Sequence, residues 1–164
     1  MFFVIGGGDM RTAKDIVDDK QDSLLTVPAT ASVYDALTIM TKHRVGSIVV
    51  TKKDQICGIW TERDLMFSVM EPDFDPRATL IEQSYSENLI TADAAENVYQ
   101  LYDKFVGKRI RHLLIKDGEK FIGLISVGDV MKASLREKAD QISSLNQKVS
   151  LEYYENWKQL KAES

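Results

Sequence analysis

The chain has 164 residues and a formal net charge of −4, with 44% hydrophobic and 28% charged residues, a balance typical of folded globular chains. The negative charge argues against a general nucleic-acid binder, because such binding depends largely on Lys and Arg side chains that neutralise phosphates. The single cysteine, Cys57, excludes an intramolecular disulfide, and together with His43 and His112 it has no recognisable metal-ligand spacing.

Residues 1–11 are predicted to form a flexible leader. They begin with an apolar run at positions 1–5 and continue with glycines at positions 6–8. The apolar run is too short and too poor in basic residues for a secretory signal, and no stretch of the chain approaches the roughly 20 apolar residues of a membrane span. With a lone cysteine, these features predict a cytoplasmic protein that has neither a membrane nor a nucleic acid as a partner.

An internal repeat organises the chain between this leader and the C-terminal tail. An offset of 65 residues carries Gly58 to Gly123 and Asp64 to Asp129, and the alignment needs no gap from residue 16 to residue 66. Other matched pairs are Ile16 with Ile81, Thr26 with Thr91, Val33 with Val98, Val45 with Ile110 and Met66 with Met131. Such self-similarity indicates one supersecondary unit that is present twice.

The first repeat is predicted at residues 12–71. It begins with a short apolar strand at 25–27, and a helix follows with Ser32 as its N-cap and an apolar face of Val33, Ala36, Leu37 and Met40. Two β-rich runs, at 47–51 and 56–60, flank a polar turn at 52–55 and predict a hairpin. A second helix is predicted to begin at Thr61.

The second repeat is predicted at residues 80–134, after a linker at 72–79 that contains Pro72 and Pro76. A short strand at 90–91 precedes a helix with an apolar face of Val98, Leu101, Tyr102 and Phe105. The hairpin strands are predicted at 112–115 and 121–125, with the turn signal Asp117-Gly118 between them. The last helix of this repeat is predicted to begin at Ser126.

The strands of both repeats are largely apolar on both faces. Such strands suit a sheet that its own helices cover on one side and the other repeat covers on the second side. Neither repeat is large enough to be expected to fold stably alone. We therefore predict an α/β fold of the α+β type, in which two tandem βαββα repeats pack with pseudo-twofold symmetry.

The tail at residues 135–164 is predicted to be a long C-terminal helix. It contains no Gly or Pro and carries an apolar stripe at helical spacing, formed by Leu135, Ile142, Leu145, Val149, Tyr153, Trp157 and Leu160. Three interpretations remain open: packing on the repeats or on a second copy, a short coiled coil that Lys138, Glu152 and Asn156 weaken, and a contact site for a partner protein.

The most informative motif is Gly-apolar-apolar-Thr/Ser-x-x-Asp, which occurs at residues 58–64 and 123–129, where a strand turns into a helix. One interpretation is structural, because Thr or Ser followed by an acid three residues later is a capping box. The other is a nucleoside phosphate site. A helix N-terminus and a hydroxyl bind phosphate, a carboxylate accepts from a ribose diol, and a glycine lets a flat base approach the backbone.

Two in-register copies of this motif resemble a tandem pair of cystathionine-β-synthase (CBS) domains, also called a Bateman module. The stretches 61–64, 111–113 and 126–129 are similar to small bacterial stand-alone CBS proteins with a C-terminal helix, and the resemblance covers residues 12 to about 135. It implies a regulatory module that binds an adenine nucleotide in clefts between the two repeats. AMP is the first expectation, with ATP or NADH as alternatives. The resemblance also implies a homodimer and a separate effector protein.

The candidate binding residues come from this resemblance and from the motif. The resemblance implies that Thr61 and Ser126 contact phosphate, that Asp64 and Asp129 hold the ribose, and that Thr26, Thr91 and the backbone around Val45 and Ile110 line the adenine pocket. The motif adds Gly58 and Gly123. Arg63, Arg111 and His112 are included because each could assist a phosphate, although each is also explained as an exposed charge.

No catalytic residue, catalytic cofactor or metal is predicted, because the sequence shows no nucleophile–base pair, metal cluster or intact phosphate loop. The chain is therefore not expected to be an enzyme. The alternative function is a structural dimerisation module without a ligand, in which the motif serves only as a helix cap. Trp60 occupies an apolar strand position, which indicates burial in the core or in a dimer interface.

Overall fold

The fold was taken from a computed structural model that describes residues 10–20 and 23–162, with side chains as far as residue 147. Most of the predicted leader, residues 1–9, lies outside the described residues. So do the side chains at the far end of the predicted apolar stripe, those of Val149, Tyr153, Trp157 and Leu160. Both copies of the binding motif lie within the described part of the chain.

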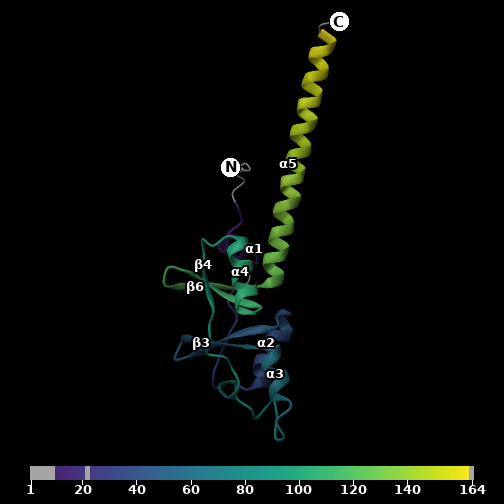
Figure 1. The fold of residues 1–164 in the computed structure, drawn as a ribbon. Coiled ribbons are helices and arrows are strands. Elements are labelled where there is room, and N and C mark those ends of the chain that lie inside the picture. The colour runs from purple at the N-terminus through teal and green to yellow at the C-terminus, as the bar shows by residue number, and fades with distance from the viewer. Residues whose placement is uncertain (1–9, 21–22, 163–164) are drawn as a thin grey trace.

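Each half of the chain has the predicted β-α-β-β-α order (Figure 1). The first half contains β1 (Thr26–Pro28), α2 (Val33–His43), β2 (Ser47–Lys52), β3 (Gln55–Thr61) and α3 (Glu62–Ser68). The second half contains β4 (Thr91–Asp93), α4 (Val98–Lys108), β5 (His112–Asp117), β6 (Lys120–Ser126) and α5 (Val127–Ala162). Two elements that were not predicted precede the halves, the helix α1 (Ala13–Lys20) and the 3-10 helix η1 (Ile81–Gln83).

The two sheets share one strand register. In each, the first strand runs parallel to the second, and the second runs antiparallel to the third. Thr26 lies opposite Val49 and Thr91 lies opposite Leu114, so the offset of 65 residues holds in the pairing as well as in the sequence. An irregularity in the second strand recurs at the same offset. The predicted α+β fold of two similar units is confirmed.

The two central helices begin and end in matching ways. Ser32, the predicted N-cap of α2, forms a capping box with Asp35, and Asn97 caps α4 in the same way. Both helices end at an arginine in the left-handed region, Arg44 with φ of 55° and Arg109 with φ of 52°. These two residues turn the chain out of each helix and towards the strand that follows, which brings it to the region between the halves.

Two apolar cores hold the molecule together, and each is completed by a segment that belongs to the other half in sequence. Ala13 and Ile16 of α1 are buried in the core of the second half. Ile81 of η1 is buried in the core of the first half. Backbone hydrogen bonds hold both segments in place. The N–H of Ala13 donates to the Glu96 carbonyl, and the N–H of Ile81 donates to the Ala31 carbonyl. The repeats are therefore interlocked rather than joined only by the linker.

The last helix of the second half and the predicted tail helix form one element. α5 has 36 residues and extends away from the two sheets (Figure 1). Val130 and Ala133 near its start are buried, but Leu135, Ile142 and Leu145 are about 60% exposed. These three side chains of the stripe therefore do not pack on the two sheets. Within the described residues, none of the helices is both long enough and apolar enough to span a membrane.

Candidate functional site

Two clefts lie between the halves and are related by the offset of the repeat. Cleft 1, of about 250 Å³, is lined by the end of β3 and the start of α3 on one side, and by residues 88–90 and 109–112 on the other. Cleft 2, of about 340 Å³, is lined by the end of β6 and the start of α5, and by residues 23–25 and 43–47. Each cleft thus joins the motif of one half to the helix–strand junction of the other.

All but three of the predicted site residues line these clefts. Cleft 1 contains Thr61, Arg63, Asp64, Ile110, Arg111 and His112. Cleft 2 contains Val45, His112, Gly123, Ser126 and Asp129. His112 lines both clefts, because it begins β5 where the two halves meet. The remaining three, Thr26, Gly58 and Thr91, line neither of the two.

Strand periodicity explains the position of the two threonines. Val27 and Ala92, the next residues of β1 and β4, are buried in the cores, so Thr26 and Thr91 face the opposite side of their strands. The residues one position earlier do line the clefts, Leu25 in cleft 2 and Ile90 in cleft 1. The adenine-pocket role of Thr26 and Thr91 stays a prediction.

The space beside Gly58 is filled by protein. A Cβ atom at this position would lie 2.5 Å from the Ser86 carbonyl oxygen and would overlap the ring of Tyr85. A Cβ atom at Gly123 would lie 2.8 Å from the methyl carbons of Val17. Both glycines therefore allow the segment that precedes the other half in the chain to pack closely on a hairpin. This segment contains Tyr85 and Ser86 at Gly58 and Val17 at Gly123. The interpretation that Gly58 admits a nucleotide base is wrong, because Tyr85 and Ser86 already cover it.

We expect Gly58→Ala to destabilise the fold without any ligand present. A methyl group would be forced against main-chain atoms of Ser86, and overpacking of this kind costs about 1–3 kcal/mol. The unfolding midpoint should fall by roughly 2–12 °C. Gly107→Ala is the matched control, because nothing lies within 4 Å of that position and alanine favours the helix by up to about 1 kcal/mol. An unchanged midpoint for Gly58→Ala would contradict the packing role.

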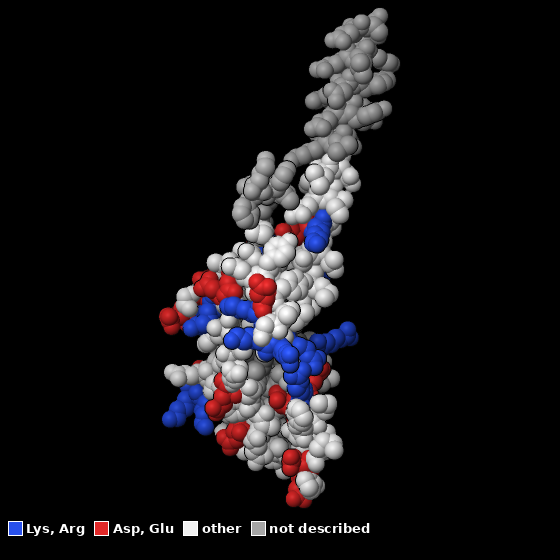
Figure 2. All heavy atoms as spheres, in the orientation of Figure 1, with Lys and Arg blue, Asp and Glu red and all other residues white. Residues whose placement is uncertain are grey.

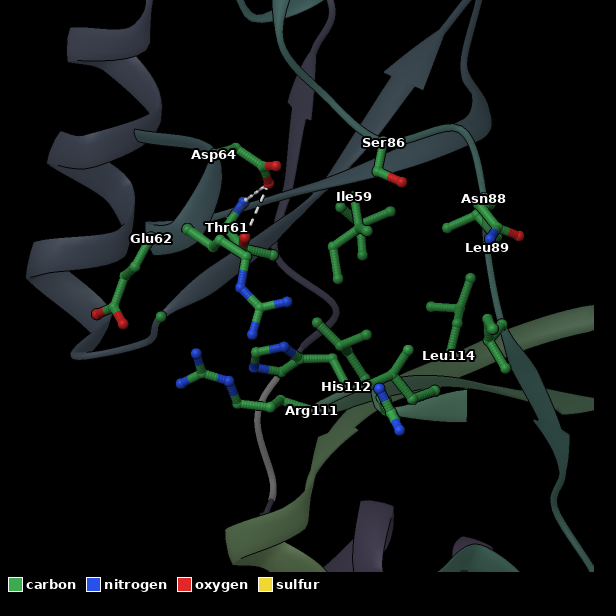
Figure 3. Close-up of a pocket in the computed structure, with 17 residues that line it drawn as sticks. Ile59, Thr61, Glu62, Asp64, Ser86, Asn88, Leu89, Arg111, His112 and Leu114 are labelled. Carbon is green, nitrogen blue, oxygen red and sulfur yellow. Dashed lines mark hydrogen bonds between the residues drawn. The ribbon is translucent and has the colours of Figure 1, made fainter. Parts of the chain in front are cut away.

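The acids of the motif form the predicted capping interactions. Oδ2 of Asp64 accepts from the backbone N–H and the hydroxyl of Thr61, both at 2.8 Å (Figure 3). Oδ2 of Asp129 accepts from the same groups of Ser126, at 2.7 and 2.9 Å. In the part of the chain that the structure describes, Oδ1 of Asp64 accepts no hydrogen bond. The cap thus uses only one of the two carboxylate oxygens of Asp64.

Cleft 1 is rich in arginine. Arg63, Arg109 and Arg111 all line it, and none of them lies within 4.0 Å of a carboxylate among the described residues. Figure 2 shows Lys and Arg side chains gathered near the middle of the molecule, where the two halves meet. Glu62 and Asp64 are the acids of this cleft. The arrangement suits an anionic group, because a guanidinium binds phosphate oxygens through paired hydrogen bonds.

Cleft 2 is different in its charges, because Lys20 reaches into it from α1. Its Nζ lies 3.0 Å from Oδ2 of Asp129 and 3.0 Å from the carbonyl oxygen of Leu124. The sequence offered no signal for this contact, since Lys20 and Asp129 are far apart in the chain. Arg109 was also not assigned to the site, although its place just before a cleft strand, at the same offset from Arg44, could have indicated it.

The ionisation of the cleft residues follows from their surroundings. Burial lowers the pKa of His112, and the charges of Arg111 and Lys20 act in the same direction. Burial acts to raise the pKa of Asp129, but the hydrogen bonds from Ser126 and Lys20 outweigh it, so the pKa lies below its usual value. At neutral pH, Asp129 and Lys20 therefore form an ion pair, and the positive charge of cleft 1 comes from its arginines.

The other predictions for these residues concern absence or burial. In the described ranges, no three His, Cys, Asp or Glu side chains are grouped so that they would hold a metal ion. Trp60 is fully buried in the core of the first half, as one of its two predicted positions required. Its indole N–H donates to the hydroxyl of Ser84 at 2.9 Å.

Comparison with known proteins agrees with this geometry. The CBS domain family model matches residues 13–71 and 82–136. The CBS domain-containing protein CBSX3, mitochondrial, of Arabidopsis thaliana is 30% identical over 149 residues, which cover 85% of this chain and 72% of that protein. An uncharacterized protein of Methanopyrus kandleri is 30% identical over 111 residues, 66% of this chain and 57% of that protein. Both relatives are thus longer than the part that matches.

Solved structures share the fold. A CBS-domain containing protein from Agrobacterium tumefaciens is 30% identical, with a TM-score of 0.70 over 76% of this chain and 99% of that one. A CBS domain protein from Pyrobaculum aerophilum complexed with AMP is 21% identical, with a TM-score of 0.63 over 73% of this chain and 89% of that one. The CBS domain pair of another protein, in complex with 5′-methylthioadenosine and S-adenosyl-L-methionine, is 20% identical with a TM-score of 0.67, over 78% and 98% of the two chains. The chain therefore belongs to the CBS domain family and contains two CBS domains in tandem.

Proposed function

We propose that this chain is a regulatory module that binds an adenine nucleotide in cleft 1. The observation that carries the proposal is the meeting, in one cleft between the two CBS domains, of the Thr61–Asp64 pair and three arginines that have no acidic partner among the described residues. Phosphate, ribose and base each have a suitable counterpart there. Asp64 keeps Oδ1 available for a ribose hydroxyl, and the arginines suit a phosphate.

The apolar lining of cleft 1 suits a base. Ile59 comes from the first half, and Leu89, Ile90 and Leu114 come from the second. A flat heteroaromatic ring between them would bury apolar surface of both domains at once. The cleft volume of about 250 Å³ lies just below the range of about 300–1,000 Å³ for ligand sites, so a mononucleotide fits better than a dinucleotide such as NADH.

The two ligand-bound relatives support adenosine recognition. The Pyrobaculum aerophilum protein is complexed with AMP, and the other pair binds 5′-methylthioadenosine and S-adenosyl-L-methionine. These ligands share an adenosine group and differ at the ribose 5′ position. The arginines of cleft 1 favour a phosphate at that position over a thioether or a sulfonium group, which carry no negative charge there. AMP is therefore our proposed ligand, ahead of ATP and NADH.

The regulatory effect follows from the position of the ligand between two domains. A nucleotide that contacts both domains favours the mutual arrangement in which both sets of contacts form, and it shifts the population only by its difference in affinity between arrangements. The homodimer and the effector protein remain predictions. Exposed apolar side chains on α3 and α5 support them, among them Met66, Phe67, Leu135 and Ile142. The proposed module regulates rather than catalyses, and the proposed location is the cytoplasm.

A dimerisation module without a ligand is the second candidate. It is favoured by one observation: the hydroxyls of Thr61 and Ser126 donate to Asp64 and Asp129, as in a helix cap that serves no ligand. In that case nucleotides would leave the stability of the protein unchanged.

Thermal unfolding with added nucleotides tests the proposal. AMP at about a hundred times its dissociation constant should add roughly 2.7 kcal/mol to the free energy of unfolding, because it binds only the folded state. The midpoint should rise by roughly 5–10 °C. Ribose 5-phosphate is the matched control, since it has the charge and the sugar but no base to bury, and it should give little shift.

The protein for this experiment must first be shown by mass spectrometry to carry no nucleotide from expression. Equal shifts with AMP and ribose 5-phosphate would show that the site recognises only phosphate. No shift with AMP, ADP, ATP or NADH at millimolar concentration would favour the dimerisation module.

A further inference from the structure

The two clefts differ at the carboxylate that faces the ligand. In cleft 2, Nζ of Lys20 lies 3.0 Å from Oδ2 of Asp129, and both side chains are only partly exposed, at 29% and 26%. In cleft 1, no ammonium or guanidinium group of the described residues lies within 4.0 Å of Asp64. One acid is thus paired inside the protein, and its counterpart is not.

The repeat shows why the difference arises. The offset of 65 residues carries Lys20 to Tyr85. Tyr85 packs against Gly58 and donates its hydroxyl to Glu87 at 3.1 Å, so it does not reach Asp64. The carbonyl of Ile59, which corresponds to that of Leu124, accepts from the backbone N–H of Ser86 at 2.9 Å. In cleft 2 the ammonium group of Lys20 takes the place of that N–H and continues to the acid.

Lys20 is held in this position by the helix that carries it. Ala13 and Ile16 of α1 are buried in the core of the second half. Asp19, the residue before Lys20, accepts from Arg11 and from Arg136 of α5, the latter at 3.4 Å. α1 is therefore fixed on the same half that supplies Asp129, and this packing places Nζ of Lys20 within 3.0 Å of Oδ2 of Asp129.

We propose that Lys20 acts as an internal ligand of cleft 2, so that this chain takes one nucleotide, in cleft 1. The inference rests on the proposed function. In both acids the hydrogen bonds to the described residues use Oδ2. A ribose diol that enters cleft 2 would therefore donate to a carboxylate whose charge Lys20 already neutralises, beside an ammonium group that bonds to two protein oxygens. In cleft 1 the same diol meets a carboxylate that has no cationic partner among the described residues.

The test is the stoichiometry of AMP binding, measured by isothermal titration calorimetry on the full chain and on Lys20→Met. Methionine keeps the length of the stem and removes the charge. The wild type is expected to bind one AMP per chain, and Lys20→Met to bind two. Lys14→Met is the matched control, because Lys14 lies on the same helix, is exposed and pairs with Asp18 on that helix. It should bind one.

Two further variants exclude a folding defect as the cause of a changed stoichiometry and show whether the second AMP lies in cleft 2. Lys20→Gln, which can still donate to the Leu124 carbonyl, should also bind two AMP, and its unfolding midpoint without ligand should stay near that of the wild type. Lys20→Met combined with Asp129→Ala should return to one. Two AMP on the wild type, or one on both Lys20 variants, would overturn this inference and leave the proposed function standing. No binding to any variant would overturn the proposed function itself.

Discussion

Replacing Asp64 by alanine is expected to weaken AMP binding about ten- to a hundredfold, whereas Asp129→Ala should leave the affinity of the wild-type chain unchanged. A hydrogen bond to a charged group contributes about 1.5–3 kcal/mol, and each 1.4 kcal/mol is a factor of about ten in affinity. Asp64 has one carboxylate oxygen outside its helix cap. Asp129 is already paired with Lys20. Calorimetric titration of both variants measures the difference.

The cap itself must be separated from the ligand contact. Asp64→Ala also removes the acceptor of two hydrogen bonds from Thr61, which should cost about 1 kcal/mol of stability. Asp64→Asn retains an acceptor for the Thr61 N–H but has no charge. It should lose binding nearly as much as alanine while it unfolds closer to the wild type. Equal losses of affinity in Asp64→Ala and Asp129→Ala would contradict the assignment of the ligand to cleft 1.

Local pattern was sufficient to predict the repeat, the strands and many of the residues that line the two clefts. Hydrophobic periodicity located the strands and the two central helices, because it reports directly which face is buried. The offset between the copies then placed the second motif from the first. The capping box at Thr61 and Asp64 was readable because its two partners are three residues apart. For the same reason, Ser32 was recognised as the N-cap of α2.

Contacts between segments that are distant in the chain could not be predicted from the sequence. Lys20 and Asp129 meet only because α1 precedes the first half in the chain but packs on the second half. No local pattern distinguishes this from packing on the first half. Gly58 was interpreted as a place for a base because the sequence does not show that Tyr85 fills the space. The sequence also did not show that Leu25 and Ile90, rather than Thr26 and Thr91, line the clefts, and a shift of one residue moves a side chain to the other face of a strand.

The segment with η1 precedes the second half in the chain but packs on the first half, and this packing gives Trp60 a role beyond filling the core. Its ring is fully buried in a core that includes Ile81 and contacts Tyr85, and its N–H donates to Ser84. All three partners belong to the segment that enters the second half. That segment continues into residues 86 and 88–90, which line cleft 1. Trp60 therefore connects the stability of the first half with the shape of the proposed binding site.

Trp60→Ala is expected to cost about 3–5 kcal/mol in the free energy of unfolding, because a large aromatic side chain leaves a cavity that the surrounding core fills only partly. The unfolding midpoint should fall by roughly 6–20 °C. Trp60→Phe, which keeps most of the apolar volume and loses the hydrogen bond to Ser84, should cost about 1–2 kcal/mol. Comparing the two by thermal unfolding separates packing from hydrogen bonding.

Protein concentration distinguishes this core role from a role in a dimer interface, the other position predicted for Trp60. If the ring stabilises the fold of one chain, the loss in Trp60→Ala is the same at low and high protein concentration. A ring that acted mainly between two chains would give a loss that depends on concentration, because association is linked to folding by mass action. The full burial of Trp60 within a single chain predicts the first result. AMP binding by Trp60→Phe should then remain close to that of the wild type, since the segment that lines cleft 1 stays docked.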